Sequence, residues 1–163
     1  MRRTRLLVVL VVVAVAAAGS LLVGRSPDRG ERVDARVEHV TDGDTVWLTG
    51  IGKVRLIGID TPEVYGQVEC YGPQASAFAK RLLPPGRRVT YELGPEQRDR
   101  YGRALAYVWL DDGRFLNRLL VERGYATPLT IPPNDAYAAQ FAADAREARS
   151  AGRGLWGVPG CAA

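Results

Sequence analysis

The chain has 163 residues, 47% of them hydrophobic, which is enough for one domain with a single core. Its formal net charge of +4 falls to +1 when the three arginines before residue 23 are set aside. The overall charge therefore does not predict binding to a polyanion, and any such attraction must come from local clusters. The single histidine, His39, excludes a metal centre made of several histidines and is expected to be an ordinary strand residue.

The N-terminus has the pattern of an export signal. Arg2, Arg3 and Arg5 precede an uncharged apolar segment from Leu6 to Val23. Small residues around Ala18 predict cleavage there, although the same segment could span a bilayer as an uncleaved anchor. In both cases we expect a secreted or extracytoplasmic membrane-anchored protein, with a polar linker over residues 24–32 and a domain over 33–163.

The first part of this domain is predicted to form a three-stranded meander. Residues 33–48 alternate between apolar and polar side chains around an Asp-Gly turn at 42–43. The alternation changes phase between Val37 and Val40, which predicts a bulge. A third strand is expected over Lys53–Ile59.

The rest of the chain alternates predicted helices and strands. Five short strands with a helix after the third predict an α+β fold, a five-stranded OB-type β-barrel with about three packed helices, preceded by the N-terminal apolar signal or anchor helix. The remaining elements are expected to be a helix over Pro73–Leu83, strands over Arg88–Leu93 and Ala104–Leu110, a helix over Phe115–Arg123, and a helix capped by Asn134 that runs to about Ala151.

Acidic residues form two clusters at predicted strand ends. Asp42 and Asp44 lie in a tight turn, and Asp60 and Glu63 follow the third strand. Carboxylates in such positions are ligands for a hard cation such as calcium, although each cluster alone is also a common turn or strand end. Thr61 precedes a proline and is held extended, which separates Asp60 from Glu63. Glu63 is then free for another role, such as activating water.

Two arginines are placed to oppose these acids. Arg55 begins the strand that ends at Asp60, and Arg103 lies just before the fifth strand. Facing a metal-bound phosphate, they would neutralise charge that develops in a transition state, an effect of about 2.7–4 kcal/mol per donor. The alternative for each is a surface or barrel-end salt bridge.

The two cysteines, Cys70 and Cys161, are predicted to form a disulfide because their number is even and the domain is expected in an oxidising compartment. Such a bridge would tie the C-terminal tail to the body and contribute about 4 kcal/mol. The alternative is two free thiols.

The motifs DGDT, RLIGIDTPE, YGPQAS and DRYGRALAYV occur in the order and at the spacings of the thermonuclease family, also called staphylococcal-nuclease-like proteins. The resemblance covers roughly Val33–Trp156. It implies an OB-fold, calcium-dependent phosphodiesterase that hydrolyses DNA and RNA to 3′-phosphorylated products. The Cys70 and Cys161 positions resemble those of exported bacterial relatives, which supports the disulfide.

The resemblance also implies roles for four oxygen-bearing residues. Asp44 and Asp60 would be calcium ligands, together with the backbone carbonyl of Thr61. Glu63 would be the general base that prepares water for attack on phosphorus.

Four further residues would contact the substrate. Arg55 and Arg103 would bind the phosphate and stabilise the transition state. Arg100 and Tyr101 match family positions that contact a terminal phosphate and the nucleotide. The chain is expected to act as a monomer.

The sequence departs from the family in the segment ATPLTIPPN, which lacks the tyrosine pair that lines the nucleotide pocket of the best-known member. Leu129 or Ile131 would offer apolar contact there instead. The loop VYGQVEC after Glu63 is also shorter than expected. The competing hypothesis is a catalytically weak nucleic-acid-binding module tethered at the cell surface, but such modules lose the acidic and arginine residues that this chain retains.

Overall fold

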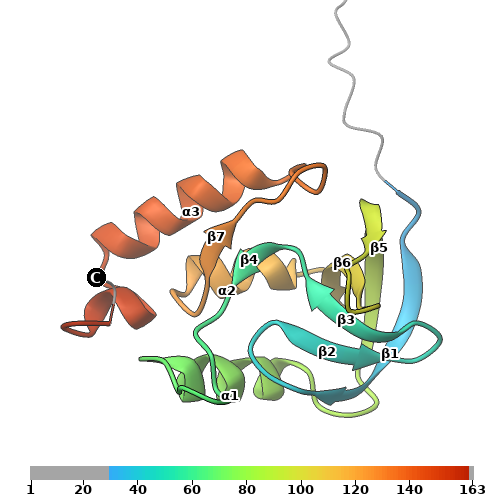
Figure 1. Ribbon diagram of the computed structural model, residues 1–163, viewed down its shortest axis with the longest axis horizontal. Helices are drawn as coiled ribbons and strands as arrows, with labels where there is room; N and C mark the ends of the chain where they lie inside the picture. The colour runs from blue at the N-terminus through green and yellow to red at the C-terminus, as the bar shows by residue number, and fades with distance from the viewer. Residues whose placement is uncertain (1–29, 162–163) are drawn as a thin grey trace, which may run out of the picture.

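The computed structural model describes residues 30–161 (Figure 1). The signal or anchor segment over 1–23 and most of the linker over 24–32 lie outside the described residues. Among the residues from 30 to 161, no helix is long and apolar enough to cross a membrane.

Five strands close into the barrel that the sequence predicts. They follow one another around it in the order β1-β2-β3-β6-β5. All neighbours are antiparallel except β3 and β6, which pair in parallel. The register shifts between Val37 and His39, which confirms the predicted bulge. The strands are β1 (Val33–Val40), β2 (Thr45–Leu48), β3 (Gly52–Leu56), β5 (Arg88–Arg98) and β6 (Ala104–Leu110).

Three α-helices accompany the barrel, as expected. In Figure 1, α3 runs across the top of the view and α1 lies at the bottom. Aromatic side chains from β6, from the turn before α2 and from α3 pack between the barrel and α3, and Phe141 in α3 is fully buried. The helices are α1 (Gly72–Leu82), α2 (Leu116–Glu122) and α3 (Ala138–Ser150), followed by a short 3-10 turn, η1 (Gly154–Gly157).

The third strand does not run unbroken to Ile59 as predicted. It ends at Leu56, and a separate strand, β4 (Gly58–Asp60), pairs with an unpredicted strand, β7 (Thr127–Leu129). Gly58 has φ +81°, a conformation that side-chain-bearing residues rarely adopt, and it lies against the ring of Phe141. The chain therefore turns out of the barrel at this point and carries Asp60 with it.

A buried asparagine stabilises this turn. Asn117 in α2 has no exposed surface, and its Nδ2 donates a hydrogen bond to the carbonyl of Ile57 at 2.9 Å. Its Oδ1 accepts from the amide of Val108 in β6 at 3.0 Å. The Asn117 side chain thus pairs with a backbone carbonyl of one segment and a backbone amide of another, which the hydrogen bonds between barrel strands leave unpaired at this point.

The prediction that Asn134 caps the last helix is wrong. Helix α3 begins at Ala138 after Tyr137, and the Asn134 side chain pairs instead with both backbone groups of Glu96. Its Oδ1 accepts from the Glu96 amide and its Nδ2 donates to the Glu96 carbonyl, each at 3.0 Å. β5 also runs five residues past its predicted end at Leu93, to Arg98, so that Glu96 lies within it.

The predicted disulfide is present. Cys70 and Cys161 are bonded, with their Cα atoms 5.2 Å apart and a sequence separation of 91. The bond fixes the end of the chain to the segment just before α1, on the side of the molecule where η1 lies (Figure 1).

We expect the double variant Cys70→Ser/Cys161→Ser to lose roughly 4 kcal/mol of unfolding free energy, because the bond restricts a long loop of the unfolded chain. Chemical denaturation of the oxidised protein and of the variant measures the difference. Reductant should lower the stability of the wild type and leave the variant unchanged. Equal midpoints for the oxidised protein and the variant would contradict the expectation.

Candidate active site

The turn between β1 and β2 positions the first acidic residue. Asp42 Oδ1 accepts a hydrogen bond from the Asp44 amide at 3.2 Å, which fixes the turn around Gly43. Asp44 is buried, and its Oδ1 accepts from the hydroxyl of Thr45 at 3.2 Å. A buried carboxylate needs compensating partners, and the other oxygen of Asp44 finds them on a distant segment.

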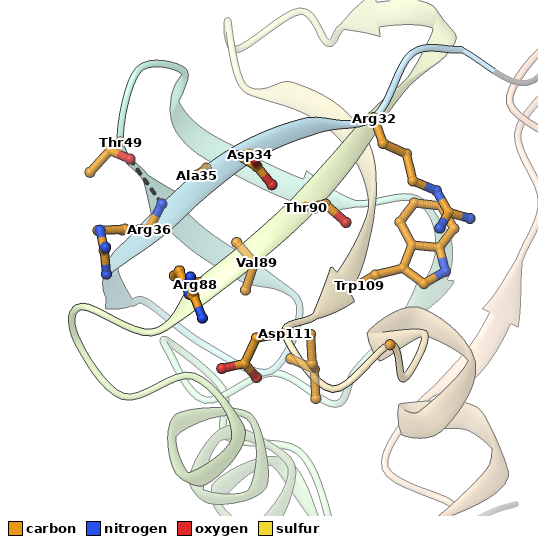
Figure 2. Close-up of a pocket in the computed structure, with 12 residues that line it drawn as sticks. Arg32, Asp34, Ala35, Arg36, Thr49, Arg88, Val89, Thr90, Trp109 and Asp111 are labelled. Atoms are coloured by element: carbon orange, nitrogen blue, oxygen red, sulfur yellow. Dashed lines mark hydrogen bonds between the residues drawn. The ribbon is translucent and has the colours of Figure 1, made fainter.

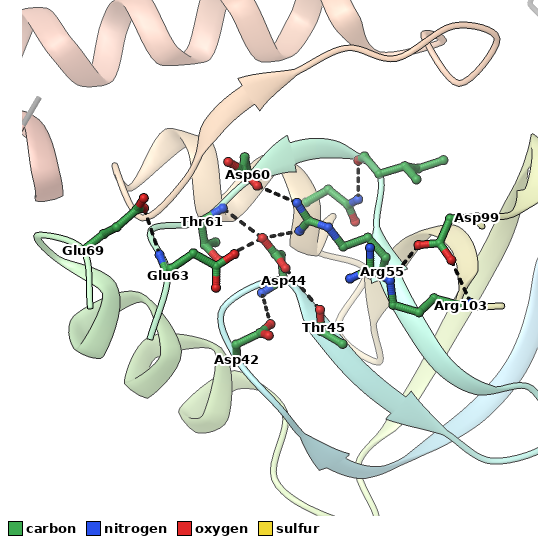
Figure 3. A network of polar contacts seen from close by, with 12 residues as sticks. Asp42, Asp44, Thr45, Arg55, Asp60, Thr61, Glu63, Glu69, Asp99 and Arg103 are labelled. Atoms are coloured by element: carbon green, nitrogen blue, oxygen red, sulfur yellow. Dashed lines mark hydrogen bonds and ion pairs between the residues drawn. The ribbon is translucent and has the colours of Figure 1, made fainter. Parts of the chain in front are cut away.

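Asp44 joins the hairpin turn to the end of β4. Its Oδ2 accepts hydrogen bonds from the amide and the hydroxyl of Thr61, both at 2.9 Å, and forms an ion pair with Arg55 (Figure 3). Gly43 lies so close to the Thr61 side chain that a Cβ there would overlap it. The backbone of the turn therefore packs directly against the Thr61 side chain at the strand end.

Arg55 connects the two acidic clusters. Besides Asp44, its guanidinium pairs with Asp60, with Nη2 at 2.6 Å from Oδ1. Burial lowers the pKa of Arg55, attraction to Asp60 opposes this, and repulsion from Arg103 lowers the pKa further. The carboxylates of Asp44 and Asp60 thus converge on a single cation, and a second guanidinium lies close enough to repel it.

The same carboxylates fit a hard divalent cation by their chemistry. The candidate ligands, Asp44, Asp60 and the Thr61 carbonyl, are all oxygen donors, which calcium prefers. Residues 30–161 contain no cluster of three or more histidine, cysteine, aspartate or glutamate side chains arranged around a metal position. A cation here would therefore have two protein carboxylates and would complete its shell with water, and the Asp60 side chain, 51% exposed, leaves room for that.

Glu63 is fixed by its backbone and free at its side chain. Its amide donates to Glu69 Oε2 at 3.0 Å, and its carbonyl accepts from the Glu69 amide at 2.9 Å. Gly72, at the start of α1, lies directly against the Glu63 carbonyl. Within residues 30–161 the exposed Glu63 carboxylate takes part in no hydrogen bond or ion pair, so it remains available to a ligand.

The second arginine is fixed by a neighbouring acid. Arg103 Nε donates to Asp99 Oδ2 at 2.7 Å, and the Arg103 amide donates to Asp99 Oδ1 at 2.9 Å. Burial alone would raise the pKa of Asp99, but the hydrogen bonds from Arg103 and from the Tyr101 amide outweigh it and hold that pKa below its usual value. Asp99 thus orients Arg103 through Nε and leaves its terminal nitrogens available.

Arg55 and Arg103 face the same cleft, which has a volume of about 480 Å³. Arg100 and Tyr101 also line it, with Arg100 Nη2 donating to the Tyr101 hydroxyl at 2.7 Å. The opposite wall includes Leu129 and Ile131, which are 40% and 58% exposed. The cleft therefore combines three arginines with apolar surface.

The structure brings most of the sequence-predicted residues together. Direct contacts join Asp44, Asp60, Thr61 and Arg55, and the cleft adds Arg103, Arg100 and Tyr101. Glu63 follows Thr61 by two residues at the base of the 63–69 loop. Their catalytic and binding roles stay predictions at this point.

Sequence reasoning missed three residues that support this site: Asp99, Glu69 and Asn134. Only Asp99 carried a usable signal, because an aspartate four residues before an arginine across a tight turn can accept both its backbone and side-chain hydrogen bonds.

We expect Asp99→Asn to lower the unfolding free energy by roughly 1–2 kcal/mol near neutral pH, since a charged acceptor is lost. The pKa of Asp99 is depressed in the folded protein, so its contribution is complete above the ordinary value of 3.8 and is lost as the pH falls below it. Urea titrations of both proteins as a function of pH would show the difference shrinking in acid. Asp34→Asn, at a carboxylate without a partner in residues 30–161, is the control, and a pH-independent difference would refute the account.

Comparison with known proteins is consistent with this arrangement. Residues 53–158 match the family described as "Staphylococcal nuclease homologue". The chain is 39% identical over 144 residues to the thermonuclease of Staphylococcus intermedius, an alignment that covers 82% of this chain and 84% of that protein. It is 37% identical over 127 residues to the thermonuclease of Staphylococcus hyicus, with 74% of each chain covered.

A longer relative shares the same region. Endonuclease YhcR of Bacillus subtilis is 35% identical over 135 residues, which cover 74% of this chain and 11% of that protein. The family match over residues 53–158 includes nearly all of β3, the whole of β5 and β6, and every residue that lines the cleft, whereas β1, β2 and Asp44 precede it. The chain therefore belongs to the family of staphylococcal nuclease homologues, and by that membership it is a nuclease-type hydrolase.

Proposed function

We propose that this nuclease is a calcium-dependent phosphodiesterase that hydrolyses both DNA and RNA. The observation that carries the proposal is the sharing of Arg55 between Asp44 and Asp60, in the same cleft as Arg103. The unpaired Glu63 follows two residues after Thr61, which binds Asp44 (Figure 3). Cations that can bind a phosphate, carboxylates that can bind a metal and a free base then meet around one position.

The two guanidiniums would bind the scissile phosphate. Arg55 and Arg103 repel each other across the cleft, and an anion between them would remove that repulsion. Each guanidinium offers several N–H donors in a planar arrangement that matches phosphate oxygens. Because negative charge increases on these oxygens as phosphorus becomes five-coordinate, the two arginines stabilise the transition state more than the ground state.

Glu63 would act as the general base. Its carboxylate accepts a proton from a water molecule while the water oxygen bonds to phosphorus, and the bond from phosphorus to the 5′-oxygen breaks. The leaving 5′-oxygen takes a proton from solvent, so the products are a 3′-phosphate and a 5′-hydroxyl. The two hydrogen bonds between Glu63 and Glu69 fix the backbone that carries the base, which supports a defined position for proton transfer from water.

Asp44, Asp60 and the Thr61 carbonyl would hold the calcium ion. When bound, the ion supplies positive charge to a non-bridging phosphate oxygen. Its presence would also give both carboxylates a cation of their own, so Arg55 could turn from Asp60 towards the phosphate. The exposure of Asp60 allows that exchange without rearrangement of the barrel.

We propose broad substrate use because the cleft offers few groups that read bases. Its charged side chains are arginines suited to phosphate, and its apolar wall of Leu129 and Ile131 can contact any base. We also propose that the protein works outside the cytoplasm as a monomer. The Cys70–Cys161 disulfide supports this location, since such bonds persist mainly in oxidising compartments.

We expect Glu63→Gln to lower kcat by orders of magnitude while the melting temperature stays near that of the wild type, because the exposed carboxylate supports no contact within residues 30–161. The assay is release of acid-soluble nucleotides from denatured DNA and from RNA with calcium and then with a chelator. The control is Glu38→Gln, an exposed carboxylate on β1. Wild-type rates in Glu63→Gln would remove the general-base role, and tight binding without any hydrolysis by the wild type would favour the binding-module hypothesis.

Calcium should raise the melting temperature of the wild type, because a ligand that binds only the folded state stabilises it by about 2.7 kcal/mol at a concentration of 100 times its Kd. Asp60→Asn should greatly reduce this shift, whereas Glu38→Gln should retain it. Thermal unfolding with calcium or magnesium, in the absence of nucleic acid, measures the effect without relying on catalysis. An equal shift in Asp60→Asn would place the cation elsewhere.

A further inference from the structure

A second groove lies on the barrel wall formed by β1 and β5, outside the candidate active site. It has a volume of about 680 Å³, and none of the proposed catalytic or metal-binding residues lines it. Figure 2 shows Arg36 and Arg88 at one end of the groove and Arg32 at the other. The guanidinium of Arg32 lies over the indole of Trp109, 3.7 Å from the ring centre.

Arg36 and Arg88 are directly opposite each other in the antiparallel pairing of β1 with β5. Side chains in this relation have Cβ atoms about 4.5–5.5 Å apart, and like charges there are destabilising. Both side chains are exposed. The repulsion between these two arginines therefore destabilises the folded protein. An anion bound between the two guanidiniums would offset this repulsion.

Few contacts within the protein occupy these two side chains. Arg36 Nη1 donates to the carbonyl of Gly86 at 3.0 Å. The guanidinium of Arg88 takes part in no hydrogen bond, ion pair or aromatic contact in the described part of the chain. The remaining N–H donors of both arginines are available to a ligand, and bidentate binding of phosphate suits their geometry.

The acidic residues of the groove do not cancel this charge. Asp111 is bound by another arginine, Arg87, with Nη2 at 2.6 Å from Oδ1. Asp34 faces Thr90 across the strand pair, two residues along each strand from the Arg36–Arg88 pair, and its single negative charge offsets only one of the two arginines. Arg32 is paired with Glu92, with Nε at 3.8 Å from Oε2, so the positive charge that remains in the groove comes from Arg36 and Arg88.

We propose that this groove is a second phosphate-binding site, in which Arg36 and Arg88 contact the backbone of a nucleic acid strand away from the point of cleavage. The proposal rests on the proposed nuclease function for its choice of anion, because a nuclease meets long polyanionic strands. Contacts of this kind would increase affinity for long substrates without reading their sequence. A protein with little overall charge would then bind a polymer through two local groups of arginines, those of the active-site cleft and the Arg36–Arg88 pair of the groove.

The test is binding of fluorescent single-stranded DNA to the full chain in a chelator, so that the result does not depend on hydrolysis. An OB fold occupies about 4–16 nucleotides, so strands of about 4 and about 30 nucleotides separate one site from both. For the long strand, Arg36→Ser/Arg88→Ser should reduce the slope of log K against log salt by about 1.4 and lower affinity roughly 10- to 30-fold at about 0.1 M salt. Arg88→Lys should retain much of the slope.

The matched control removes two exposed arginines from the helices, Arg81→Ser/Arg146→Ser. An equal loss in this control would mean that net charge alone matters and would overturn the proposal. So would unchanged binding of the long strand by the groove variant. If inorganic phosphate binds in the groove but does not affect strand binding, the groove is a site for a small anion and the proposal is wrong. Absence of hydrolysis with calcium would refute the proposed function and leave this result intact.

Discussion

The contact between Asp44 and Thr61 determines the geometry of the site. One carboxylate oxygen accepts both the amide and the hydroxyl of Thr61 and also pairs with Arg55, so a hairpin turn, a strand end and a barrel strand meet at one atom. Because this carboxylate is buried, each lost partner would leave an uncompensated charge. The arrangement is therefore stable only when all three segments are in register, and the barrel supplies that register.

The sequence predicts the barrel and its five strands well, because apolar alternation and Asp-Gly turns are local signals. It fails where a distant side chain decides the local structure. The strand predicted over Lys53–Ile59 breaks at Gly58, where Asn117 in a later helix binds the Ile57 carbonyl. Asn134 leaves its expected cap for the backbone of Glu96. Both asparagines satisfy unpaired backbone groups, and no local pattern reveals which groups those will be.

The candidate site also combines residues that local sequence signals predict with supporting residues that they do not. Residue types and motif order pointed to Asp44, Asp60, Glu63, Arg55 and Arg103, and the structure places Arg55 and Arg103 in one cleft, pairs Asp44 and Asp60 with Arg55, and leaves Glu63 outside the cleft lining, two residues after Thr61. The residues that fix these side chains were not foreseeable in the same way. Glu69 accepts from the Glu63 amide through its side chain and donates to the Glu63 carbonyl through its own amide, and both contacts depend on a loop path that local sequence does not reveal.

Two glycines without any chemical function define how tightly this site is built. Gly43 lies against the Thr61 side chain and Gly72 against the Glu63 carbonyl, in both cases too close for a Cβ. A methyl group at Gly43 would overlap the Thr61 side chain, and one at Gly72 would overlap the backbone of the candidate base. Mutagenesis that replaces only side chains with functional groups would leave out both glycines. Selection of random mutant libraries for activity should show that both positions are among the least tolerant of substitution in the chain.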